Sequence, residues 1–114
     1  MITTDSLAAY GADTKEGLTR CMNNESFYLR MVKMIPGDEN FGKLFDAVGR
    51  GDLDAAFEAA HALKGPTGNL ALTPLYAPVC EITELLRART DTDYSALVAS
   101  IRDARSRLSE LCAE

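Results

Sequence analysis

The feature that most constrains the fold of this chain is the spacing of its apolar residues, which follows the period of an α-helix. Phe41, Leu44, Phe45 and Val48 occur at positions i, i+3, i+4 and i+7, so their side chains share one face of a helix. No segment shows the strict apolar–polar alternation of a half-buried strand. The chain is therefore expected to be all-α.

Turn and capping residues divide the chain into helical segments. Pro36-Gly37-Asp38 predicts a break, and the sequence leaves open whether the pieces on either side form one kinked helix or two. Gly49-Arg50-Gly51-Asp52 predicts a glycine cap, a tight turn and an N-cap aspartate. Thr73-Pro74 predicts a new helix with Thr73 as its N-cap. The expected helices cover residues 2–10, 15–22, 25–35, 41–48, 52–70, 74–89 and 97–112.

These segments predict an up-and-down four-helix bundle with short N-terminal helical segments. At 114 residues the chain is expected to form one domain, residues 1–114. We also expect a monomer, because each helix can bury its apolar face within the chain. On the last helix, Arg102, Arg105 and Arg107 are expected to point into solvent.

Composition excludes several classes of partner and location. The net charge of -5 and a pI near 4.8 argue against binding to nucleic acid or to an anionic membrane surface. No apolar run approaches the roughly 20 residues that span a bilayer, and the N-terminus lacks a basic-then-apolar secretion signal. Cys21, Cys80 and Cys112 are far apart and odd in number, which is typical of reduced thiols. We therefore expect a cytoplasmic protein.

The only histidine, His61, lies in the helix expected over residues 52–70. At about 100° per residue, His61, Gly65 and Gly68 fall on one strip roughly 60° wide, with Lys64 at its edge and long enough to reach the imidazole. A glycine inside a helix costs about 1 kcal/mol relative to alanine, so two on this strip indicate close approach by another surface. Four other residues of the segment are expected to face elsewhere: Leu53, Phe57, Ala60 and Thr67.

His61, Leu63, Lys64 and Gly65 resemble the signature of the histidine-containing phosphotransfer (Hpt) domain, approximately His-x-Leu-Lys-Gly followed by small residues. Gly68-Asn69-Leu70 resembles the continuation of that signature. The resemblance implies a phosphocarrier of a multistep two-component phosphorelay, which takes a phosphoryl group from an aspartate of one receiver domain and passes it to another. Such a protein is a phosphotransfer intermediate rather than an autonomous enzyme.

The same resemblance assigns roles to individual residues. His61 would accept the phosphoryl group through Nε2, and Lys64 would attract the phosphoryl oxygens. Gly65 and Gly68 would leave room for the receiver, so a larger residue at Gly68 is expected to fold normally but to hinder docking. Asn69 would contact the phosphate or the partner. The catalytic magnesium would belong to the receiver, so no cofactor is expected on this chain.

Two departures from the family pattern leave an alternative open. Pro66 stands where the family usually has a small residue compatible with a helix, and Ala71 stands where many members carry another glycine. Pro66 is expected to kink or loosen the helix just past His61. The alternative is a four-helix interaction module that keeps the fold but has lost phosphotransfer. A zinc site is disfavoured, because one histidine and scattered cysteines cannot supply a tetrahedral ligand set.

Overall fold

The computed structural model describes residues 2–113, and all the regular structure in that range is helical. The sequence-based prediction of an all-α fold is therefore confirmed. The elements, in chain order, are α1 (Thr4–Tyr10), α2 (Thr14–Arg20), α3 (Glu25–Met34), the 3-10 turn η1 (Ile35–Gly37), α4 (Glu39–Arg50), α5 (Leu53–Asn69), α6 (Thr73–Arg87) and α7 (Ser95–Ala113).

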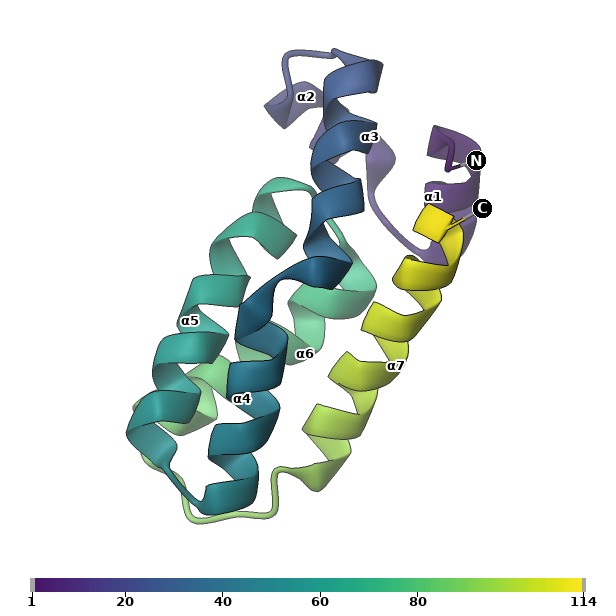
Figure 1. Cartoon of the computed structure of the whole chain (residues 1–114). Coiled ribbons are helices and arrows are strands. Elements are labelled where there is room, and N and C mark those ends of the chain that lie inside the picture. Colours follow the sequence, from purple (N-terminus) through teal and green to yellow (C-terminus); the bar gives the residue numbers. More distant parts are fainter. Residues whose placement is uncertain (1, 114) are drawn as a thin grey trace.

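Four helical rods form an up-and-down bundle: the broken rod α3–α4, then α5, α6 and α7 (Figure 1). Neighbouring helices along the chain pack against each other from α4 to α7. Alanines on the inner face of α5 bring the adjacent backbones close, and larger aliphatic side chains fill the centre. The fully buried core includes Leu44, Ala56, Ala60, Leu63, Leu75, Val79, Ile82, Ile101 and Leu108.

Local sequence signals explain most of the helix ends. Pro36 lies in η1, so the segment that the sequence left open is two helices joined by a 3-10 turn. Gly51 ends α4 with a φ of 73°, a left-handed conformation that favours glycine. Asp52 then begins α5, because its carboxylate accepts a hydrogen bond from the Ala55 N–H at 3.0 Å.

One predicted cap, Thr73, is wrong by one residue. Helix α6 begins after Leu72, with Thr73 as its first residue and no side-chain cap. The Leu72 side chain is fully buried, and its carbonyl accepts from the N–H groups of Leu75 and Tyr76 at 2.9 and 2.8 Å. A buried apolar residue therefore holds the cap position of this helix.

Of the three α7 arginines expected to point into solvent, Arg102 and Arg107 are exposed, as predicted, and Arg105 is half-buried. Arg102 and Arg105 also lie over aromatic rings of α4. The guanidinium carbon of Arg102 lies 4.2 Å from the centre of the Phe45 ring. That of Arg105 lies 4.9 Å from the Phe41 ring, and its Nε donates to the Pro36 carbonyl at 2.9 Å. These contacts cover the seam between α4 and α7.

The N-terminal helices are tied to the bundle by buried hydrogen bonds. The Tyr10 hydroxyl donates to the carbonyl of Ala104 in α7 at 2.8 Å. The Tyr28 hydroxyl donates to the Leu70 carbonyl at 3.0 Å, at the end of α5. In Figure 1, α1 accordingly lies beside the C-terminal end of α7. Over residues 2–113, no helix is both long and apolar enough to cross a membrane.

Candidate functional site

His61 lies at the middle of α5 and is exposed to solvent. The buried residues of this helix are on its opposite side, so the core does not use the imidazole; they are Ala56, Ala59, Ala60, Leu63 and Thr67. The predicted exposure of His61 is therefore confirmed. Pro66 does not end the helix, which continues to Asn69.

Phe57 is the first neighbour of His61, contrary to the prediction that it faces elsewhere. The two rings stack with their centres 5.5 Å apart and their planes 13° from parallel. Residues four apart are neighbours on a helix surface, and Phe57 is only half-buried at the edge of the core face. From α6, the guanidinium carbon of Arg87 lies 5.0 Å from the centre of the Phe57 ring on this same side of α5. The imidazole therefore stands in an aromatic and cationic environment.

Lys64 is half-buried and directed towards α6. Its Nζ lies 3.9 Å from Oε2 of Glu84, and the Nε of Arg87 lies 3.3 Å from that same oxygen. Sequence reasoning missed Glu84 and Arg87, because a helical pattern does not say which residues of the next helix lie opposite. The only local signal was their spacing, an acid followed three residues later by a base.

The two glycines of the predicted strip have different surroundings. Gly65 is exposed, and a Cβ atom placed there would meet no atom of another element within 4 Å. A Cβ atom at Gly68 would lie 2.7 Å from Cε1 of Tyr76, which is closer than real contacts allow. The prediction that Gly68 freely accepts a larger residue is therefore wrong, because Tyr76 occupies that space. The Gly68 carbonyl also accepts a hydrogen bond from Arg20 of α2 at 2.6 Å.

Asn69 and Ala71 lie where α5 ends. Asn69 is exposed, at the edge of a cavity of about 500 Å³ that is also lined by Met34 of α3 and by Pro66. Ala71 has a φ of 54°, which is a left-handed conformation. A glycine adopts this conformation more easily than alanine, which explains why a glycine would suit this position.

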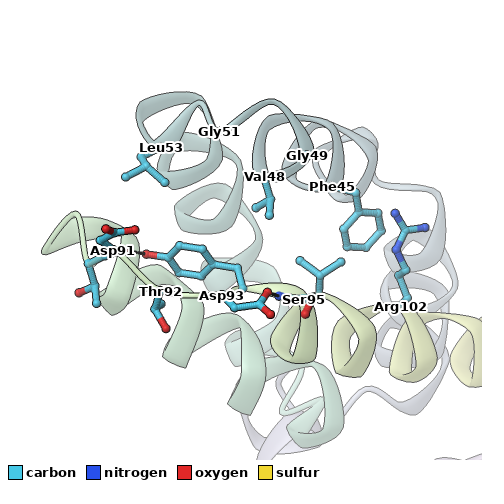
Figure 2. A pocket seen from close by; sticks show the side chains of 13 residues that line it. Phe45, Val48, Gly49, Gly51, Leu53, Asp91, Thr92, Asp93, Ser95 and Arg102 are labelled. Atoms are coloured by element: carbon cyan, nitrogen blue, oxygen red, sulfur yellow. Dashed lines mark hydrogen bonds between the residues drawn. The ribbon is translucent and has the colours of Figure 1, made fainter.

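A cavity of about 600 Å³ elsewhere in the bundle contains none of the predicted site residues. It lies between the end of α4, the start of α5 and the link to α7, with Asp91 and Asp93 at one side and Arg102 at another (Figure 2). The Asp93 carboxylate already accepts a hydrogen bond from the Ser95 N–H at 2.9 Å, and this hydrogen bond lowers the pKa of Asp93. Within residues 2–113, no three His, Cys, Asp or Glu side chains gather as metal ligands do.

Fold and site together define a helical bundle with one histidine exposed at the middle of a long helix. The Hpt domain family model matches residues 37–113, and the chain belongs to that family. Hpt domains are histidine phosphotransfer intermediates of phosphorelays and interact with receiver domains. No curated protein and no solved structure is significantly similar to the chain. The match begins at Gly37, so α1, α2 and α3 lie outside it.

Proposed function

We propose that this chain is a phosphocarrier in which His61 takes a phosphoryl group from the aspartyl phosphate of one receiver domain and passes it to an aspartate of another. The observation that carries the proposal is the position of His61, exposed at the middle of α5 with the open Gly65 one turn away. A receiver can approach this part of the helix without displacing any side chain at Gly65.

The chemistry needs only a neutral imidazole and a docked acyl phosphate. The lone pair of Nε2 forms a bond to phosphorus, while the bond between phosphorus and the aspartate oxygen breaks and its electron pair leaves with the carboxylate. The imidazole proton on Nδ1 then passes to solvent. Lys64 supplies a positive charge that attracts the phosphoryl oxygens as they arrive. The second transfer reverses these steps with a new aspartate.

The other predicted residues take different places in this proposal. Gly65 supplies the clearance for the receiver, and Asn69 lies at the edge of the docking surface. Gly68 provides space for Tyr76 instead, so it supports the site through packing. Magnesium would be bound by the receiver domain, and the chain itself would need no cofactor.

We propose further that residues 1–114 act as one domain and as a monomer in the cytoplasm. The hydrogen bonds of Tyr10 and Tyr28 to the bundle support a single unit. The apolar faces of α4 to α7 are buried within one chain, which supports a monomer. All three cysteines are free, which supports a reducing compartment.

The proposal is tested by transfer from a receiver domain that carries a radioactive phosphoryl group on its aspartate. We expect the wild-type chain to gain a label that is labile in acid and stable in alkali, and His61→Gln to gain none. The free energy of unfolding of His61→Gln should change by less than about 1 kcal/mol, because only the stack on Phe57 is lost. A folded wild-type chain that binds receivers but is never labelled would instead be the interaction module named above.

A further inference from the structure

Lys64 and Glu84 form an ion pair that is too long to be a firm hydrogen bond. Their closest atoms, Nζ and Oε2, are 3.9 Å apart, whereas a hydrogen bond between nitrogen and oxygen measures about 2.7–3.2 Å. The Lys64 side chain is 35% exposed and that of Glu84 is 58% exposed, so water screens their attraction. This contact directs the Lys64 side chain towards α6. Breaking the ion pair would cost little free energy.

Glu84 also has a second cationic partner. The Nε of Arg87 lies 3.3 Å from the same Oε2 atom, and these two residues are one turn apart on α6. If Lys64 moves away, Arg87 still balances the carboxylate. Arg87 is itself held in place, because its guanidinium group lies over the Phe57 ring. The site therefore contains one acid shared by two cations, of which only Lys64 is on the helix of His61.

We propose that Glu84 is a positioning residue, which holds Lys64 towards α6 while His61 is free and releases it to the phosphoryl group during transfer. This inference rests on the proposed function of His61. An incoming phosphoryl group offers several charged oxygens, so it attracts the Lys64 ammonium more strongly than one screened carboxylate oxygen does. Lys64 follows His61 by three residues, and residues at that spacing are neighbours on the helix surface.

The consequence is that Glu84 competes with the phosphoryl group for Lys64. Glu84→Gln removes this competition but keeps the shape of the side chain and an oxygen that accepts from Arg87. Lys64 is then free to act on the phosphoryl group from the start. We therefore expect Glu84→Gln to accept phosphoryl groups about two- to five-fold faster than the wild type, because the free energy of an exposed ion pair corresponds to a factor of that size.

The experiment uses phosphoramidate, a small phosphoryl donor, so that receiver docking does not affect the result. The imidazole nitrogen bonds to phosphorus as the phosphorus–nitrogen bond of the donor breaks and ammonia departs. The rate of formation of phosphohistidine is followed by ³¹P NMR in the wild type, Glu84→Gln, Lys64→Gln and the double variant. Thermal unfolding of each variant shows that the fold is kept.

Glu81→Gln is the matched control, because it removes the same charge from the same helix. Glu81 is exposed and lines a groove with Leu97 and Arg107 of α7, whereas Glu84 is the carboxylate that pairs with Lys64. We expect Glu84→Gln to speed the reaction only when Lys64 is present, and Glu81→Gln to leave the rate unchanged.

Three results would overturn the inference while leaving the phosphocarrier intact. In the first, Glu84→Gln leaves the rate of phosphohistidine formation unchanged. In the second, Glu84→Gln changes that rate equally in the presence of Lys64 and in the Lys64→Gln background. In the third, Glu81→Gln changes the rate as much as Glu84→Gln does. The last two would mean that the carboxylate acts only through its general charge. A wild-type chain that is labelled neither by phosphoramidate nor by receivers would overturn the proposed function, and this inference with it.

Discussion

The same substitution is expected to have opposite effects at two glycines of α5 that are three residues apart. Gly65 is exposed, and a Cβ atom there would meet no atom of another element within 4 Å. Alanine is better than glycine inside a helix by about 1 kcal/mol. Gly65→Ala should therefore raise the free energy of unfolding by about that amount.

At Gly68 the new methyl group would collide with the ring of Tyr76. The Cβ atom would lie 2.7 Å from Cε1, 3.2 Å from Cδ1 and 3.3 Å from Cζ of that ring. Ordinary contacts between carbon atoms are about 3.5–4.0 Å, so the ring or the backbone has to move. Overpacking of this kind costs about 1–3 kcal/mol, against a gain of at most about 1 kcal/mol in helix propensity. Gly68→Ala should therefore lower the free energy of unfolding by about 1 kcal/mol.

Both variants can be measured by thermal and urea unfolding, followed by circular dichroism. For a domain of this length, 1 kcal/mol shifts the melting temperature by about 4 °C. We expect Gly65→Ala to melt about 4 °C higher than the wild type and Gly68→Ala about 4 °C lower. In a Tyr76→Ala background the collision is absent, so Gly68→Ala should become stabilising. If Gly68→Ala stabilises the wild-type chain as much as Gly65→Ala does, the packing argument is refuted.

A substitution at Gly65 can also distinguish an effect on stability from an effect on receiver docking. Glutamine is nearly as good a helix former as alanine, so Gly65→Gln should fold at least as stably as the wild type. Its side chain would stand in the path of a receiver but would not exclude a small donor. We expect transfer from a phosphorylated receiver to slow by about tenfold or more, while labelling by phosphoramidate stays close to the wild-type rate.

The remaining predictions concern Lys64 and Tyr28. Lys64→Ala should slow transfer to His61 about 10-fold, the size of one charge interaction of about 1.4 kcal/mol, and an unchanged rate would contradict its role. Tyr28→Phe should cost about 1–2 kcal/mol in the free energy of unfolding at pH 7, because the buried Leu70 carbonyl loses its donor. Burial raises the pKa of Tyr28 from 10 to about 12, so its contribution to stability is complete below pH 10 and lost between pH 10 and 12. The free energy of unfolding obtained from urea titrations should therefore fall across that range by an amount on the order of 1–2 kcal/mol, and by less in Tyr28→Phe. A flat profile would contradict this reasoning.

The bundle could be predicted from the sequence because its helices and turns are specified by nearby residues. Gly51 and Asp52 illustrate this: one ends α4 through its own φ angle, and the other caps α5 through its own carboxylate. Leu72 shows the limit of such reasoning. It holds the cap position of α6 with a fully buried side chain, and no side-chain cap in the sequence marks that position.

The candidate site likewise has features that the sequence predicts and features that depend on another helix. The exposure of His61 follows from its angular position within α5, which the sequence contains. Gly68 was placed wrongly because its surroundings come from α6, in the side chain of Tyr76. The orientation of Lys64 likewise depends on Glu84 of α6. Phe57 was also placed wrongly, but the sequence contained the signal, because residues four apart on a helix are neighbours on its surface.

The short link between α5 and α6 nevertheless contains part of the missing information. Two antiparallel helices joined by a few residues pair symmetrically about their turn. Gly68 with Tyr76, and Phe57 with Arg87, are both symmetric about residue 72, which lies in that link. Lys64 with Glu84 departs from this symmetry, because Glu84 lies four residues, about one helical turn, beyond the symmetric partner of Lys64. Pairing residues across the link therefore places α6 beside α5, so the proposed site draws on two helices and includes Glu84 and Arg87 together with Lys64.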